Sequence, residues 1–110
     1  MSKISAVIIT NNEERNIARC IESLKNVADE IIVIDSYSKD GTVTIAIKMG
    51  AKVISHPFSG YGEQKDFAQQ QASNDWILSL DADEALSPEL EKSILAVKND
   101  LQNDAYRFNI

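Results

Sequence analysis

The chain is poor in the residues that build several common kinds of site. It has one cysteine, Cys20, and one histidine, His56, among 110 residues. A disulfide needs two cysteines, and structural zinc sites need several cysteine or histidine ligands, so both are excluded within this sequence. A single cysteine also fits a reducing compartment, and we therefore expect a cytoplasmic protein.

Basic residues and long apolar runs are scarce as well. Eleven lysines and arginines stand against 17 acidic residues, which gives a formal net charge of −6 at pH 7. Nucleic-acid binding requires a basic footprint, so we expect no nucleic-acid partner. An anionic ligand would be repelled unless a cation lay between it and the protein. No apolar stretch approaches the roughly 20 residues that span a bilayer.

Glycine-rich phosphate loops are missing too. The sequence has four glycines, and they form neither a dinucleotide-binding fingerprint nor a P-loop after the first strand-like segment. We also find no histidine and aspartate partners that would make a hydrolase triad with a serine. The usual glycine-rich nucleotide-binding motifs and the serine hydrolases therefore do not account for this chain.

What the sequence does contain is a regular alternation of strand-like and helix-like segments, enough for one domain. Predicted strands cover residues 4–10, 30–35, 51–55, 75–80 and 105–110. Predicted helices follow the capping pair Asn11-Asn12, cover 42–49 and 62–72, and begin again at Ser87-Pro88. This order predicts an α/β fold, a three-layer sandwich with a mostly parallel sheet.

Polar residues gather where these strands end. Segment 10–13 (TNNE) follows the first strand, Asp35 ends the second, and segment 81–84 (DADE) follows the fourth. Ligands of parallel sheets bind beyond the carboxyl ends of the strands, so we expect these residues to share one cleft. Asp35 is interpreted as facing a ligand, whereas Asp40 is interpreted as a structural cap of the next helix.

Segment 81–84 places three carboxylates within four residues. Ionised carboxylates held together repel one another, and a cation is the usual remedy. Oxygen ligands favour Mg²⁺ or Mn²⁺, which keep coordination positions free for substrate phosphates. The alternative is a solvated acidic turn ahead of the helix at Ser87, and the position at a strand end favours the metal site.

Three blocks together resemble the opening of the family-2 inverting glycosyltransferases, which have the GT-A fold. The blocks are ISAVIITNNEERNIARCIESL, EIIVIDSYSKDGT and NDWILSLDADE, and the resemblance runs from about Ile4 to Ile110. An Asp-x-Asp triplet alone occurs by chance in many chains, but the order and spacing of all three blocks are specific. The segment GYGEQK at 60–65 further resembles bacterial enzymes that glycosylate the lipopolysaccharide core.

The resemblance implies a role for individual residues. Asp83 would be the direct ligand of Mn²⁺ or Mg²⁺, Asp35 would contact the base, usually uracil, and Asp81 would approach the ribose or sugar. Lys65 would reach the base or phosphates, unless it is only a solvated helix residue. The nucleotide-sugar pocket as a whole would be lined by Thr10, Glu13, Asp35, Lys65 and Asp81.

Two positions depart from the family pattern. Asn11 stands where relatives usually have an aromatic residue that stacks on the base, so the base site is expected to be weaker or differently built. Ser36 replaces the second acid of a common double-aspartate pattern. A metal or ribose role at that position is therefore in doubt.

Taken to function, the resemblance implies transfer of a sugar from a nucleotide-diphosphate donor, usually a UDP-sugar, to a glycan or lipid-linked acceptor with inversion. The catalytic base, which removes the proton of the acceptor hydroxyl, lies well beyond the acidic triplet in relatives, so we expect it beyond Ile110. Residues 1–110 would be the nucleotide-sugar-binding N-terminal part of the domain, inactive alone. We expect a peripheral association with the inner face of the membrane, and self-association through uncovered edge strands.

Three other interpretations stay open. The first is a nucleotide-sugar-binding module without catalysis. The second is a nucleotidyltransferase, although such enzymes usually carry a glycine- and arginine-rich loop where this chain has TNNE. The third is a receiver-type signalling domain, which places acids after strands one and three, whereas here they follow strands two and four.

Overall fold

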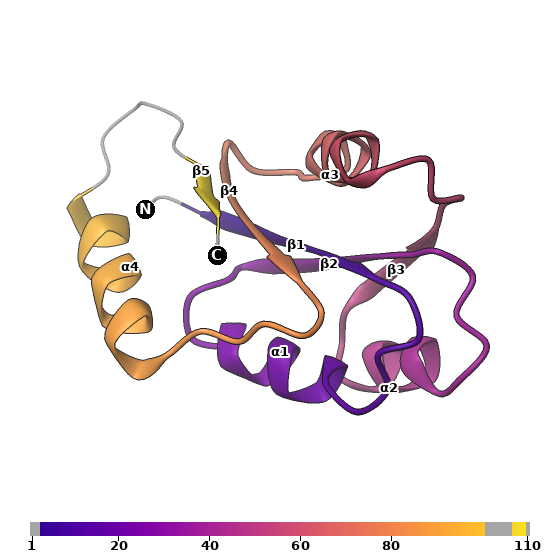
Figure 1. Ribbon diagram of the computed structural model, residues 1–110. Coiled ribbons are helices and arrows are strands. Elements are labelled where there is room, and N and C mark those ends of the chain that lie inside the picture. Colours follow the sequence, from indigo (N-terminus) through magenta and orange to yellow (C-terminus); the bar gives the residue numbers. More distant parts are fainter. Residues whose placement is uncertain (1–2, 101–106, 110) are drawn as a thin grey trace.

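The predicted alternation of strands and helices is how the chain folds (Figure 1). The computed structural model describes residues 3–100 and 107–109. The strands are β1 (Ile4–Thr10), β2 (Glu30–Asp35), β3 (Lys52–Ser55), β4 (Trp76–Asp81) and β5 (Arg107–Asn109). The helices are α1 (Ile17–Leu24), α2 (Thr42–Lys48), α3 (Tyr61–Gln70) and α4 (Pro88–Asp100).

One sheet joins the strands in the order β3-β2-β1-β4-β5, and every pairing between them is parallel. Figure 1 shows α1 and α2 on one face of this sheet and α3 on the other. The three-layer sandwich that the sequence predicts is therefore confirmed, with a sheet that is parallel throughout its described part.

The central strand β1 explains how two cores form on one sheet, because alternate side chains of a strand point to opposite faces. Ile4, Ala6 and Ile8 pack with the apolar residues of α1, α2 and α4. Val7 and Ile9 pack instead with β2 residues and with α3. All seven residues of β1 are buried, so the run of apolar residues in the sequence corresponds to a strand covered on both sides.

The start of α1 corrects one prediction. Its buried face is the expected one, but the helix begins at Ile17 after Asn16, and not directly after Asn11-Asn12. The two asparagines are used elsewhere: the Asn11 side chain donates to the carbonyl of Ser36 at 2.6 Å. The Asn12 side chain accepts the backbone N–H of Lys39 at 2.8 Å. They join two loops and do not cap a helix.

The other elements lie within two residues of their predicted bounds at the ends that are described. Gly50 ends α2 in a left-handed conformation, with φ of 91°. Ser87 caps α4, because its Oγ accepts the backbone N–H of Leu90 at 3.1 Å. The predicted fifth strand is seen at 107–109, and its other residues lie outside the described part. No helix within the described residues is long and apolar enough to cross a membrane.

Candidate functional site

The carboxyl ends of β1, β2 and β4 form one rim of the sheet, and a cleft of about 250 Å³ lies there. The residue register places Thr10 beside Asp35 on one side, and Ile9 beside Asp81 on the other. The lining comes from four parts of the chain: Ile9, Thr10, Asn11 and Glu13 from β1 and its loop, Ser36 after β2, Phe58, Tyr61 and Gln64 from α3 and its loop, and Asp81, Ala82 and Asp83 after β4.

The structure brings together four of the residues that the sequence proposes for the site: Thr10, Glu13, Asp81 and Asp83. Asp35 and Lys65 do not belong to the lining. Lys65 is half-buried on α3, directly after Gln64, which does line the cleft. Direct contacts of Asp35 and Lys65 with a nucleotide stay predictions.

Three buried side-chain oxygens in this cleft have no hydrogen-bond partner. They are Thr10 Oγ1, Gln64 Oε1 and Asp81 Oδ1, and they are the three such atoms among the described residues. A buried polar atom left unpaired costs about 1–3 kcal/mol, so native proteins pair nearly all of them. The three residues that carry these acceptors all line one cleft, which indicates a ligand that supplies hydrogen-bond donors or a cation.

The acidic loop after β4 is held by its own backbone and by α1. Glu84 Oε1 accepts the backbone N–H of Asp81 at 2.7 Å, and the Glu84 N–H donates to the Asp81 carbonyl at 2.9 Å. The guanidinium of Arg19 donates to the carbonyl of Asp83 at 3.1 Å. These contacts fix the loop and leave the side chains of Asp81 and Asp83 at the cleft.

The third carboxylate of this loop, that of Glu84, is engaged by the protein itself. Its side chain turns back to the backbone, because the N–H of Asp81 at the end of β4 offers it a hydrogen bond. In the part of the chain that the structure describes, no three acidic, histidine or cysteine side chains converge to hold a metal. Any cation here would rest on Asp81 and Asp83, with other ligands from phosphate or water.

Asp35 does not line the cleft but holds the loop next to it. It is buried, and its carboxylate accepts both the backbone N–H of Ser38, at 2.9 Å, and the Ser38 hydroxyl. The same Ser38 Oγ accepts the N–H of Asn12 at 2.8 Å. Asp35 therefore ties the loop after β2 to the loop after β1, and the next residue, Ser36, is the one that lines the cleft.

Asp40, further along the same loop, makes hydrogen bonds of the same kind to Thr42. It accepts the N–H of Thr42 at 3.0 Å and the Thr42 hydroxyl, whose oxygen in turn accepts the N–H of Glu13 at 2.9 Å. The hydrogen bond from the Thr42 hydroxyl lowers the pKa of Asp40. Asp40 therefore has a structural role, but the N-cap of α2 is Gly41, and Asp40 precedes it and holds the first residue of the helix. Glu13 is positioned through Thr42.

Sequence reasoning missed Gln64, Phe58 and Tyr61. Gln64 is 1% exposed, and its Nε2 donates to Ser36 Oγ at 2.9 Å. Phe58 and Tyr61 meet edge to face, with ring centroids 5.3 Å apart. Gln64 and Ala68, four residues apart, are the buried residues of α3. That spacing was the one available signal, and it is weak in a helix with so polar a sequence.

Comparison with known proteins now identifies the chain. Residues 5–106 match the sequence model of the family described as Glycosyl transferase family 2. The chain belongs to this family. Membership in this family sets aside the receiver-type and nucleotidyltransferase interpretations.

Two curated relatives illustrate the similarity. An uncharacterized glycosyltransferase of Rickettsia felis is 54% identical over 106 residues, which cover 96% of this chain and 38% of the relative. The lipopolysaccharide core biosynthesis glycosyltransferase LpsC of Rhizobium meliloti is 40% identical, with coverage of 89% and 39%. The chain thus spans about two fifths of the length of these relatives.

Solved structures agree with the fold. Glucosyl-3-phosphoglycerate synthase from Mycobacterium tuberculosis in complex with UDP is 30% identical, with a TM-score of 0.74 over 93% of this chain and 41% of that one. The same enzyme in complex with Mn²⁺, UDP and glucosyl-3-phosphoglycerate is 33% identical, with a TM-score of 0.65 over 74% and 33%. The GT-A type of α/β fold is confirmed.

Proposed function

We propose that this cleft binds the nucleoside diphosphate of a sugar donor, a UDP-sugar, together with Mn²⁺ or Mg²⁺. The observation that carries the proposal is the set of three unpaired buried oxygens at one rim of a parallel sheet. The family membership and the UDP found in solved relatives support the same ligand class.

The order of the strands suggests how the donor lies. Ser36 follows β2, Thr10 ends β1 and Asp81 ends β4, and β1 lies between the other two. Two strand spacings amount to about 10 Å along the rim. We assign the diphosphate to the acidic β4 side and the nucleoside to the uncharged β2 side, with Thr10 and Glu13 between them.

The residues fit a divalent cation. Asp81 keeps one buried carboxylate oxygen without a partner, Asp83 is exposed beside it, and oxygen donors are what Mg²⁺ and Mn²⁺ prefer. When bound, such a cation supplies the positive charge that stabilises the leaving diphosphate. Arg19 and Glu84 hold the backbone of the loop, so that the two aspartates stay at the cleft.

For the whole protein, we propose transfer of the sugar to a glycan or lipid-linked acceptor with inversion. The similarity to LpsC favours an acceptor of the lipopolysaccharide-core type. A carboxylate base must take the proton of the acceptor hydroxyl, and we assign this role to none of the residues in the cleft, whose acids face the diphosphate. Association with a membrane surface and self-association stay predictions.

The test is calorimetric titration of UDP into the chain with Mn²⁺ and with EDTA. We expect cation-dependent binding that weakens about 10- to 100-fold in Asp81→Asn and Asp83→Asn, because each change removes a charged contact. Asp75→Asn is the matched control, since Asp75 is exposed at the opposite end of β4 and carries the same charge. Equal affinity in EDTA, or in Asp81→Asn, would refute the proposal.

A further inference from the structure

Gln64 is a buried polar residue of the cleft whose amide is only half paired by the described residues. Its side chain is almost fully buried, and its amide nitrogen is engaged by Ser36 at 2.9 Å. Its carbonyl oxygen Oε1 has no partner. A carboxamide fixed through one end presents the other end in a defined direction. The unpaired oxygen therefore calls for a hydrogen-bond donor from a ligand in the cleft.

The surroundings of Gln64 indicate which part of a ligand supplies that donor. The lining residues on this side of the cleft are Ser36, Phe58, Tyr61 and Gln64, and all of them are uncharged. The acidic residues Asp81 and Asp83 lie on the far side of β1, at the end of β4 and in the loop that follows it. A carbonyl acceptor repels a phosphate, so a neutral group bearing an N–H or O–H fits this side best.

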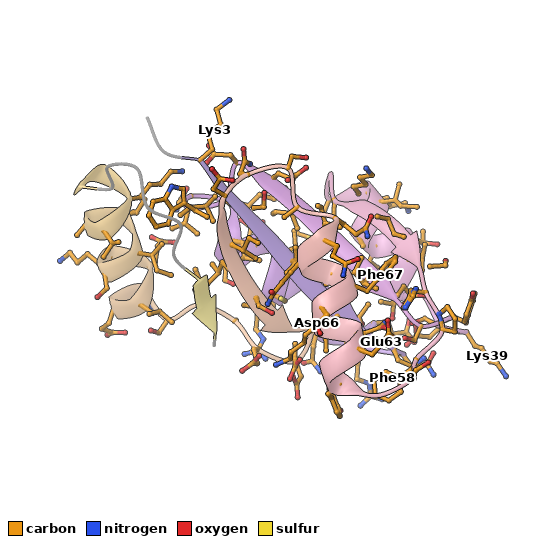
Figure 2. All side chains as sticks on the ribbon, turned by 90° about the horizontal axis from the view of Figure 1, so that it is seen from above. Lys3, Lys39, Phe58, Glu63, Asp66 and Phe67 are labelled. Atoms are coloured by element: carbon orange, nitrogen blue, oxygen red, sulfur yellow. The ribbon has the colours of Figure 1, made fainter. Side chains whose placement is uncertain are left out.

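Two exposed aromatic rings complete this end of the cleft. Phe58 and Tyr61 are 52% and 66% exposed, although both are large apolar side chains that line a cleft. Figure 2 shows Phe58 beside the first turns of α3, at the same end of the helix as Glu63. Tyr61 and Gln64 are three residues apart on α3 and so share one face of it. Flat rings beside an amide acceptor suit a planar heterocycle.

We propose that Gln64, oriented by Ser36, is a specificity-determining residue that accepts a hydrogen bond from the nucleobase of the donor. The base is a uracil-type ring, whose imide N–H lies between two carbonyls, and Phe58 with Tyr61 covers its face. This inference rests on the proposed nucleotide-binding function. It assigns base recognition to α3, whereas the side chain of Asn11, where the usual stacking ring is missing, donates to the carbonyl of Ser36.

The experiment compares three ligands in the presence of Mn²⁺: UDP, ribose 5-diphosphate, which lacks the base, and N3-methyl-UDP, which lacks the imide N–H. In Gln64→Leu we expect UDP binding to weaken about 3- to 10-fold, the size of one hydrogen bond, with ribose 5-diphosphate unchanged. Wild type should prefer UDP over N3-methyl-UDP, and the preference should vanish in Gln64→Leu. Gln70→Leu, exposed on the same helix, is the matched control.

The other residues of the subsite give the same pattern of ligands. Ser36→Ala should weaken UDP less than Gln64→Leu does, because the amide remains but is no longer oriented. Phe58→Ala with Tyr61→Ala should weaken UDP about fivefold or more through lost stacking, again without effect on ribose 5-diphosphate. Circular dichroism of each variant is the check that it is folded.

The outcomes separate the two proposals. Wild-type chain that binds no UDP overturns the proposed function and this inference together. Wild type that binds UDP and N3-methyl-UDP equally overturns this inference alone, and that comparison needs no variant. Equal losses of UDP and ribose 5-diphosphate in Gln64→Leu also overturn it, because the amide would then act on the ribose or the diphosphate.

Discussion

The two rims of the sheet are both rich in polar residues. The polar side chains described at the amino rim are paired by hydrogen bonds, whereas several at the carboxyl rim are not. Figure 2 shows Lys3 and Lys39, which mark the amino and carboxyl rims, far apart from one another. At the amino rim, Ser5 Oγ donates to Glu30 at 2.6 Å and accepts two N–H groups of Asn74, each at 3.1 Å. Glu30 also accepts the N–H and hydroxyl of Ser73.

At the carboxyl rim several polar atoms lack hydrogen-bond partners, and the backbone is strained. The three unpaired oxygens of the described residues all lie there. The two described non-glycine residues with positive φ, Asn12 at 53° and Tyr37 at 56°, follow β1 and β2 at the same rim. Strain and missing partners persist where a ligand is to complete the site. A satisfied polar cluster indicates structure, and an unsatisfied one indicates function.

Ser5 and Thr10 offer the sharpest test of this contrast, because both are buried hydroxyls on β1. We expect Ser5→Ala to lower the free energy of unfolding by about 1–3 kcal/mol, since it leaves Glu30 and Asn74 without their shared partner. Thr10→Val should leave the free energy unchanged or raise it by up to about 1 kcal/mol, because it removes an unpaired oxygen. Urea unfolding without nucleotide measures both.

Equal losses in the free energy of unfolding for Ser5→Ala and Thr10→Val would contradict the contrast between the two rims. The control substitution Ser5→Val separates the loss of hydrogen bonds from a change in size. Nucleotide titration of Thr10→Val adds a second check, since Thr10 lines the cleft and Ser5 does not.

Gly60 and Gly62 test the strain at the carboxyl rim. Gly60 has φ of 119°, which L-residues rarely adopt, whereas Gly62 lies inside α3, and a Cβ at either position would meet no atom within 4 Å. We expect Gly60→Ala to cost about 1–3 kcal/mol. Gly62→Ala should stabilise the chain by about 0.5–1 kcal/mol through helix propensity. Thermal unfolding of the pair distinguishes conformation from packing; equal shifts would contradict the reasoning.

Glu30 makes the amino rim sensitive to acid. Burial raises its pKa, but hydrogen bonds from Ser5 and Ser73 outweigh burial, and the net pKa lies below the usual 4.5. The carboxylate therefore stabilises the fold fully above about pH 4.5, and this contribution is lost as the pH falls through the lowered value. Unfolding midpoints in urea between pH 7 and pH 3 should fall less steeply in Glu30→Gln. An unchanged slope would exclude Glu30 as the source.

Cys20 gives the smallest effect, one of reactivity alone. Burial, and next the negative charge of Glu84, raise the pKa of this thiol to about 12. Its Sγ lies behind the acidic loop, 3.9 Å from the carbonyl oxygen of Asp81. At pH 8 we expect mass spectrometry to show no alkylation of folded chain by iodoacetamide and full alkylation in urea. Rapid alkylation of the folded chain would contradict the burial of Cys20 in the core.

The sequence by itself determined the layers and the rim. β-Branched runs specified β2 to the residue, and three-and-four spacing specified the buried face of α1, because burial on both faces of a parallel strand and on one face of a helix leaves a periodic pattern. The acids at the strand ends followed, since parallel strands bring their carboxyl ends together. Family resemblance then suggested the ligand class.

Tertiary structure alone decided which polar atoms are paired. Apart from its weak four-residue spacing from Ala68, nothing local distinguishes Gln64 from the other glutamines of α3, and its burial arises only when α3 packs over β1 and β2. Likewise the sequence does not show that the carboxylates of Asp35 and Glu84 accept hydrogen bonds from Ser38 and from the Asp81 backbone, because these bonds form on folding. Periodicity records burial, whereas hydrogen-bond partners far apart in the chain leave no pattern that a single sequence can show.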